Sequence, residues 1–207
     1  EYTGPHDRPL RKYPEVALTI AAVGSAYENG YKVTASHEGT NPYSGWEAFD
    51  ANGDLVGWHS NDGSGSVIAY NGTDGLYSGT TRLATETELG EWLGLELPEA
   101  IKLIDVQLVS QDYGPVVNTI DNFIVYAKKQ PGDTWTSLGV FTGKAVFQTS
   151  AAGVTVTVNA VDYYKFFAIV ATKRNGGGTN TGVSIRDLAF YGHEEGDSSL
   201  DTTLKSV

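Results

Sequence analysis

The segment EWLGLELPEAIKLIDVQLVS, residues 91–110, decides the fold class. In its first part Leu93, Leu95 and Leu97 alternate with small or polar residues, and this period of two is typical of a half-buried β-strand. Pro98 cannot donate a hydrogen bond to a strand ladder, so it is expected to end that strand. A second apolar run follows directly. The segment therefore predicts two strands joined by a short corner.

Further apolar or alternating runs recur on both sides, between turn residues such as Asn29-Gly30 and Pro131-Gly132. The expected strands are 16–20, 31–36, 91–97, 101–110, 121–129, 134–141, 154–158, 163–172 and 183–192. The run at 154–158 alternates strictly, which predicts Val inward and Thr outward. The run at 163–172 is the most apolar, which predicts a central strand. Short strands without a long helix predict an all-β protein, an antiparallel sandwich or barrel.

The composition agrees with short strands and limits the partners. Glycine contributes 25 residues and tyrosine 12, which suits a helical bundle badly because glycine destabilises helices. The formal net charge of −11 would repel phosphate backbones and anionic lipids, so we expect no nucleic-acid partner. No apolar run approaches the roughly 20 residues of a spanning helix, so no membrane insertion is expected. The absence of cysteine excludes disulfides and thiolate zinc sites.

The two ends of the chain differ from its middle. Residues 1–14 are polar and contain several prolines, which predicts an extended arm, with a disordered leader as the alternative. Residues 15–192 hold the strand pattern and are expected to form the sandwich, and residues 193–207 are expected to be a polar tail or linker. Within the sandwich, residues 37–90 are rich in Gly, Asn, Ser and Thr. Binding residues concentrate on long loops over a rigid sheet, so this stretch is expected to carry the function.

Three motifs, in this order, resemble the discoidin superfamily, also called F5/8 type C or galactose-binding-like domains. They are GWEAFDANGDLVGWHS at 45–60, GEWLGLELPEAIKLIDVQL at 90–108 and SIRDLAFYG at 184–192. The resemblance implies a discoidin-like jelly roll, an antiparallel β-sandwich in which the loops at one end form the ligand face. The stretch PLRKYPEVALT at 9–19 resembles leaders found beside such domains in large-virus and marine microbial surface proteins.

A calcium site is the best-motivated constellation. Asp50, Asn52 and Asp54 place two carboxylates and an amide in one glycine-containing loop, and calcium prefers such hard oxygen ligands. An Asn-Gly turn with incidental acidic residues is the alternative. The resemblance implies that this loop meets the acidic residue of the closing strand, here Asp187, where the family more often has glutamate. We therefore expect a structural calcium ion held by Asp50, Asn52, Asp54 and Asp187.

Candidate ligand residues combine flat aromatic faces with hydrogen-bonding groups, as sugar sites require. They are Trp58, His59 and Asn61 in one stretch, His37 after an earlier strand, and Arg174 with Asn175 before a run of glycines. Core packing is the alternative for Trp58. A surface position without a role is the alternative for His37 and Arg174.

No sequence motif indicates catalysis. There is no G-x-S-x-G elbow and no H-E-x-x-H pair, and the glycines at 176–178 are not followed by the Lys-Ser or Lys-Thr of a phosphate-binding loop. We expect a non-catalytic module that recognises a glycan or glycoprotein at an extracellular, cell or virion surface. The first alternative is a structural or docking module of a virion, fibre or surface layer that contacts neighbouring proteins through the arm. A targeting module of a secreted glycoside hydrolase and an unrecognised glycosidase are further alternatives.

Overall fold

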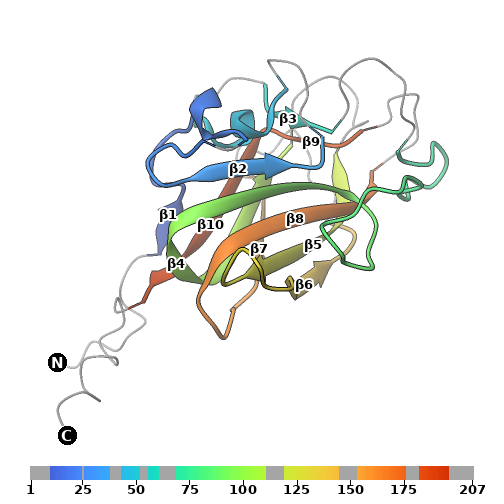
Figure 1. The fold of residues 1–207 in the computed structure, drawn as a ribbon. Coiled ribbons are helices and arrows are strands. Elements are labelled where there is room, and N and C mark those ends of the chain that lie inside the picture. Colours follow the sequence, from blue (N-terminus) through green and yellow to red (C-terminus); the bar gives the residue numbers. More distant parts are fainter. Residues whose placement is uncertain are drawn as a thin grey trace, which may run out of the picture.

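The computed structural model describes residues 10–24, 26–37, 43–51, 56–60, 69–110, 119–144, 153–175 and 182–195 (Figure 1). In chain order the elements are β1 (Arg11–Tyr13), η1 (Ile20–Ala22), β2 (Lys32–Ala35), η2 (Gly45–Phe49), β3 (Trp58–His59), β4 (Glu91–Val109), β5 (Ile120–Lys128), β6 (Thr136–Phe141), β7 (Val154–Thr157), β8 (Tyr164–Arg174), β9 (Ser184–Ile185) and β10 (Asp187–Glu194), where η marks a 3₁₀ helix. The expected all-β class is confirmed. Neither helix of the described part is long and apolar enough to cross a membrane.

Strand β4 belongs to both layers of the sandwich. Its first half pairs antiparallel with β2 on one side and β8 on the other, and β5 and β6 extend that layer. Its second half pairs with β10 and β7, and β1 extends the second layer beyond β10. Strand β8 lies between β4 and β5, so the prediction that it is central is confirmed.

The two strands expected at 91–97 and 101–110 are one continuous strand, so the predicted break at Pro98 is wrong. The pairing of β4 with β8 skips from Glu96 to Ile101, and Pro98 lies inside that gap. Its missing N–H therefore costs no ladder hydrogen bond, and the chain turns there from one layer into the other. Leucines on both sides of the corner are buried, which joins the two layers in a single core.

Two other predicted strands are also corrected. Residues 16–20 do not form a strand; η1 begins there instead, and Thr19 caps it, because its hydroxyl accepts a hydrogen bond from the Ala21 N–H at 3.3 Å. The Glu28 carboxylate accepts the Thr19 N–H at 2.7 Å and holds this cap in place. The strand expected at 183–192 is divided at Arg186 into β9 and β10.

The sheet begins inside the predicted arm and ends inside the predicted tail. Residues Arg11–Tyr13 pair with β10, and the buried Tyr13 hydroxyl donates to Glu194 Oε1 at 3.0 Å. Arg11 lies 3.0 Å from the other oxygen of Glu194. Strand β1 therefore lies within the predicted arm, and β10 ends at Glu194, within the predicted tail. Residues 1–9 and 196–207 lie outside the described residues.

Side-chain alternation decides what faces the core. Val156 is buried between exposed Thr155 and Thr157, as the strict alternation of this run predicted. The rings of Phe167 on β8 and Phe190 on β10 pack with centroids 5.1 Å apart and so connect the two layers. Burying one such ring contributes about 1.5–3 kcal/mol, which makes contacts of this kind the main source of cohesion between the layers.

A second, smaller apolar cluster lies on the outer face of the β4–β8–β5 layer. It consists of Leu83, Ile124, Tyr126, Ala168 and Val170, with Trp92 and Trp135 packed against it. Leu83 belongs to the long connection before β4, so that connection covers one part of the outer face. Leu83 does not line the part of this face near Lys32 and Lys128.

Candidate functional site

The short β3–β9 ladder lies at one end of the sandwich, at the top of Figure 1. Trp58 pairs with Ile185, and His59 pairs with Ser184. Gly57 precedes it because nothing larger fits: a Cβ at this position would lie 2.3 Å from the Arg186 Cα atom. Strand β3, which carries Trp58 and His59, is thus in direct backbone contact with β9, although over a hundred positions separate the two strands in sequence.

Trp58 serves as a core residue. Its side chain is 0% exposed and belongs to the main apolar cluster, and its indole Nε1 donates to the His37 carbonyl at 2.9 Å. The packing alternative therefore describes Trp58, and no face of its ring is open for a sugar to stack on. The indole instead fixes the backbone of His37 beside β3.

His59 lies next to a tyrosine that the sequence analysis did not single out. The His59 N–H donates to the Tyr43 carbonyl at 3.2 Å, and the two rings are tilted with centroids 5.8 Å apart. His37, Tyr43 and His59 thus come together around Trp58 at one end of the sandwich. The only signal for Tyr43 in the sequence is an aromatic residue in a Gly/Asn/Ser-rich loop, which by itself does not show what it contacts.

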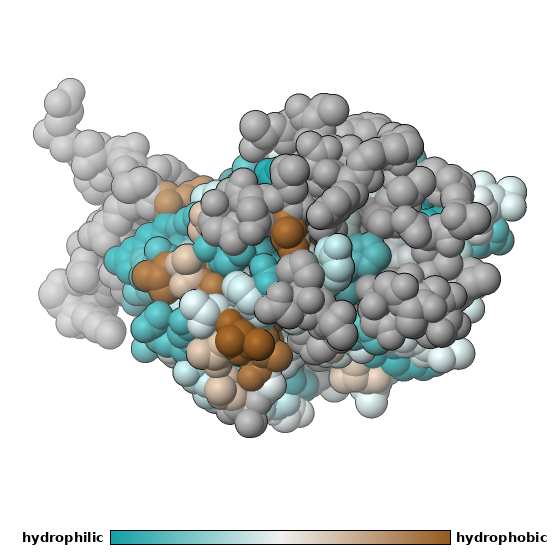
Figure 2. Space-filling model, turned by 90° about the horizontal axis from the view of Figure 1, so that it is seen from above, coloured by the Kyte–Doolittle hydropathy of each residue, from teal (hydrophilic) through white to brown (hydrophobic). Residues whose placement is uncertain are grey.

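The view from this end of the molecule shows its surface character (Figure 2). Among the coloured residues, hydrophobic ones form small separate groups between hydrophilic ones, and no broad apolar sheet is visible.

Arg174 is enclosed and does not line an open face. The Arg174 side chain is 0% exposed. The backbone N–H of Arg174 donates to the Gly75 carbonyl at 2.9 Å. Burial lowers the pKa of the guanidinium, and the neighbouring Tyr70 opposes that shift. Asn175 follows it, half-buried, and donates its N–H to the Thr119 carbonyl at 2.8 Å. Asn61 lies outside the described residues, as do the glycines at 176–178.

A buried carboxylate, that of Glu91, connects three segments of the chain. Glu91 is 5% exposed and accepts hydrogen bonds from the Ser36 hydroxyl at 2.6 Å and the Tyr77 hydroxyl at 2.9 Å. Burial, supplemented by the charge of Glu91 and opposed by hydrogen bonds with Thr81, raises the pKa of Tyr77 to about 12. This network ties the end of β2, the start of β4 and the loop around Tyr77 together. Sequence reasoning missed it, because a lone acidic residue at a strand start gives no sign of burial.

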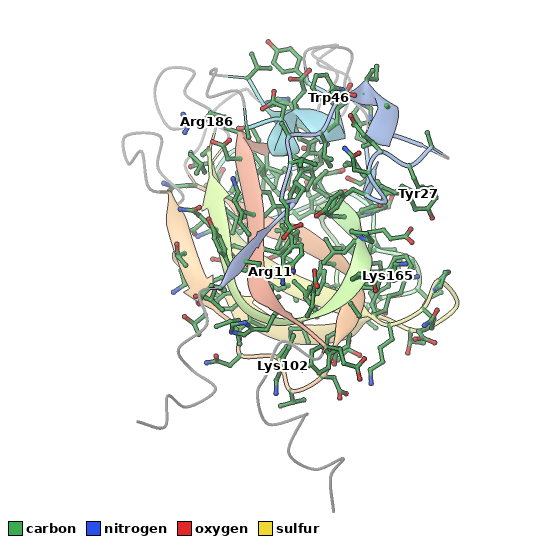
Figure 3. The ribbon with its side chains drawn as sticks, turned by 90° about the vertical axis from the view of Figure 1, so that its left-hand side faces the viewer. Arg11, Tyr27, Trp46, Lys102, Lys165 and Arg186 are labelled. Atoms are coloured by element: carbon green, nitrogen blue, oxygen red, sulfur yellow. The ribbon has the colours of Figure 1, made fainter. Side chains whose placement is uncertain are left out.

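Residues at the end of η2 and at the start of β10 line one hollow. This hollow, of about 140 Å³, is lined by Phe49 and Ala51 around the end of η2 and by Asp187 at the start of β10. Asp50 is buried at the C-terminal cap of η2. Arg186 Nε donates to Asp187 Oδ2 at 2.8 Å. Figure 3 shows Arg186 and Trp46 towards one end of the molecule and Lys102 at the other.

The described residues do not by themselves complete a calcium site. Calcium takes six to eight oxygen ligands, and the described part of the chain holds no group of three or more His, Cys, Asp or Glu side chains suited to a metal. Among the described residues that line the hollow, the acidic one is Asp187, and its carboxylate already accepts a hydrogen bond from Arg186. A cationic residue, Lys12, lines the same hollow. The other two expected ligands, Asn52 and Asp54, lie outside the described residues.

Comparison with known proteins identifies the fold. No family model and no curated protein matches the sequence. A family 32 carbohydrate-binding module from Clostridium perfringens, solved in complex with galactose, matches with a TM-score of 0.53 and 18% identity, over 79% of this chain and 94% of that one. A family 32 module from a family 31 glycoside hydrolase of the same organism gives 0.55 and 16%, over 80% and 92%. An F5/8 type C domain from Bacteroides fragilis gives 0.53 and 13%, over 80% and 93%.

These likenesses define the class of fold: the chain shares the antiparallel β-sandwich fold of these domains. More particularly, its structural neighbours are carbohydrate-binding modules of family 32 and F5/8 type C domains. The resemblance read from the three sequence motifs is confirmed at the level of the fold.

Proposed function

We propose that this chain is a non-catalytic module that binds a galactose-type glycan at the β3–β9 end of the sandwich. The observation that carries the proposal is the arrangement of Tyr43 and His59 at that end, in a fold shared with a module solved with galactose. An aromatic ring supplies a flat apolar face for the sugar ring, and an imidazole supplies hydrogen bonds to its hydroxyls.

The other expected ligand residues have different roles in this proposal. Trp58 is a positioning residue, because it packs in the core and holds the backbone of His37. Asn61, two positions after β3 in the sequence, stays a candidate for direct contact, as does Asn175. Arg174, being enclosed, is expected to support the loops around it more than to contact the glycan.

A structural calcium ion forms a second part of the proposal. Asp187 and the backbone around Asp50 would hold it together with Asn52 and Asp54, and it would link the early loop to the closing strand. The shared hollow between η2 and β10 supports this assignment. Arg186 competes for Asp187, so we expect only moderate calcium affinity.

We place the module outside the cell, on a secreted or surface protein, as glycan recognition at surfaces requires. One observation favours the docking alternative: β1, at the end of the predicted arm, pairs with β10 and so attaches the arm to the sandwich. In that alternative, residues 1–14 contact a neighbouring structural protein of a virion, fibre or surface layer.

The test is binding of galactose and N-acetylgalactosamine by calorimetry, together with a glycan array, on wild type and on His59→Ala. A lost hydrogen bond to a neutral group costs about 0.5–1.5 kcal/mol, so we expect affinity to fall by about 2- to 13-fold. His193→Ala is the matched control, because His193 pairs with Lys102 at the opposite end of the molecule. If no glycan binds the wild type and pull-downs recover a structural protein through residues 1–14, the docking function is correct.

A further inference from the structure

The outer face of the layer β2–β4–β8–β5 carries a hollow of about 250 Å³. It is lined by strand residues and by residues from the loops next to them, and it is separate from the β3–β9 end, none of whose residues line it. Its volume is below the 300–1,000 Å³ of sites for drug-sized ligands, so it suits a ligand about as large as one substituted sugar ring.

The strand register places four side chains in one row across this face. Lys32 on β2 pairs with Glu96 on β4, Glu96 pairs with Phe166 on β8, and Phe166 pairs with Lys128 on β5. Residues that pair directly project on the same side of a sheet. The row spans three interstrand spacings, about 14 Å, with an ammonium group at each end.

Two residues of the lining have side chains that belong to the core on the other side of the sheet. Leu95 and Phe167 line the hollow, but their side chains are buried in the core, so they present backbone to the hollow. Gly94, beside Leu95, has no side chain to offer. A Cβ there would lie 3.1 Å from Thr34 Oγ1, and Thr34 is an exposed lining residue of the hollow.

An aromatic ring with a lysine above it stands on each side. Lys128 Nζ lies 4.9 Å from the ring centroid of Trp135 and 5.3 Å from that of Phe166. Across the hollow, Lys32 Nζ lies 5.6 Å from the ring of Tyr27. Tyr27 is 55% exposed and projects from the side of the molecule (Figure 3). The rings provide apolar faces that can pack on sugar C–H groups, and each cation is held close to such a face.

The charges around the hollow differ from those of the whole chain. Two lysines and one glutamate line it, in a protein whose formal net charge is −11. The Glu96 carboxylate accepts a hydrogen bond from the Tyr27 hydroxyl at 2.8 Å. Lys128 donates one of its three N–H groups to the Pro131 carbonyl at 2.6 Å, which leaves donors for a ligand. The local excess of ammonium groups is complementary to a carboxylate.

We propose that this hollow is a second carbohydrate site, which binds an acidic saccharide through a uronic acid ring. The ring packs between Tyr27 and the Trp135–Phe166 side, and its carboxylate pairs with Lys32 or Lys128. This inference stands on the sheet face alone and does not depend on the glycan site at the β3–β9 end.

The experiment is an NMR titration of the full chain with an oligogalacturonate and with a neutral galactan oligosaccharide of the same length. The reporters are the backbone amides of β2, β4 and β8 around the hollow and the Trp135 indole N–H. Thr34→Tyr fills the hollow, and Lys32→Gln with Lys128→Gln removes its cations. Thr157→Tyr and Lys102→Gln are matched controls in the other layer, where Thr157 is an exposed strand threonine. His59→Ala serves as a background in which the β3–β9 site is weakened.

We expect the oligogalacturonate to shift the reporters in wild type, in His59→Ala and in both controls, and not in Thr34→Tyr. The double lysine variant should bind it about tenfold more weakly, because charged hydrogen bonds are lost, and added salt should weaken wild-type binding. An equal response to the neutral oligosaccharide, or no response to either, overturns the proposal. Reporters that move with protein concentration alone would indicate a second copy of the chain and would overturn it as well.

Discussion

Arg186 Nε lies 2.8 Å from Asp187 Oδ2, at the position where β9 ends and β10 begins. Consecutive residues of a regular strand point to opposite faces, so this bond requires the break in the strand at Arg186. The pair places a protein cation on the carboxylate that we propose as a calcium ligand. Whether calcium or Arg186 neutralises Asp187 can therefore be measured by changing one residue at a time.

For calcium, we expect the melting temperature to fall in chelator and to rise when calcium is restored. A hundredfold excess over Kd stabilises the folded state by about 2.7 kcal/mol, which is very roughly 5–10 °C for a domain of this size. Asp187→Ala should abolish the response, and Arg186→Ala should enlarge it because Asp187 loses its competing cation. Magnesium should substitute poorly, since it demands octahedral geometry.

Asp162→Ala is the control for this experiment, because Asp162 is exposed and pairs with Lys129 at 3.1 Å. Melting curves of the wild type that are identical in chelator and in calcium would refute the metal site. Arg186 would then be the partner of Asp187 in solution.

The Glu91 network should contribute measurably to stability. Tyr77→Phe removes a hydrogen bond to a buried carboxylate, and bonds to charged groups contribute about 1.5–3 kcal/mol. We expect the urea midpoint to fall with an unchanged m value. Tyr27→Phe is the matched comparison, since its hydroxyl also bonds to a glutamate but at an exposed site, and it should cause no measurable change. Equal effects of the two variants would show that burial of Glu91 is unimportant.

The same tyrosine should make stability decline in alkali. The pKa of Tyr77 is raised from 10.0 in the unfolded chain to about 12 in the folded state, so the folded state holds the proton more tightly. The corresponding stability is complete below pH 10 and is lost as the pH rises towards about 12. Urea midpoints from about pH 9 to about pH 12 should fall, and Tyr77→Phe should make the fall shallower. Burial also raises the pKa values of Tyr31 and Tyr70, so part of the slope should persist in this variant.

Gly57 should be intolerant of even one methyl group. A Cβ there would lie 2.3 Å from both the Arg186 Cα and the Ile185 carbonyl oxygen, so Gly57→Ala must separate β3 from β9. Overpacking of this kind costs about 1–3 kcal/mol, and we expect weaker glycan binding as His59 moves. Gly132→Ala is the control, because its Cβ would meet nothing within 4 Å. Wild-type thermal stability in Gly57→Ala would contradict the close approach of these strands.

Local sequence pattern was sufficient for part of the strands. Leu93, Leu95 and Leu97 alternate because a pleated strand sends successive side chains to opposite faces, and one of those faces is apolar. The alternation around Val156 predicted its burial for the same reason. The meeting of the acidic loop with the closing strand is what the resemblance implies. Of that loop, Ala51 lines the same hollow as Asp187, whereas Asn52 and Asp54 lie outside the described residues.

Only the tertiary structure decided which strands are neighbours and in what register. Pro98 was predicted to end a strand because proline has no backbone N–H to donate to a neighbouring strand. In the structure, β4 and β8 do not pair between Glu96 and Ile101, where the chain passes from one layer to the other, so no such donor is needed. Arg174 looked exposed because an arginine usually is, and the turn around Gly75 encloses it. Lys32, Glu96, Phe166 and Lys128 form one row although they come from four strands spread along the chain. A period-two pattern fixes the face of each residue, whereas its cross-strand partner depends on how two whole layers pack.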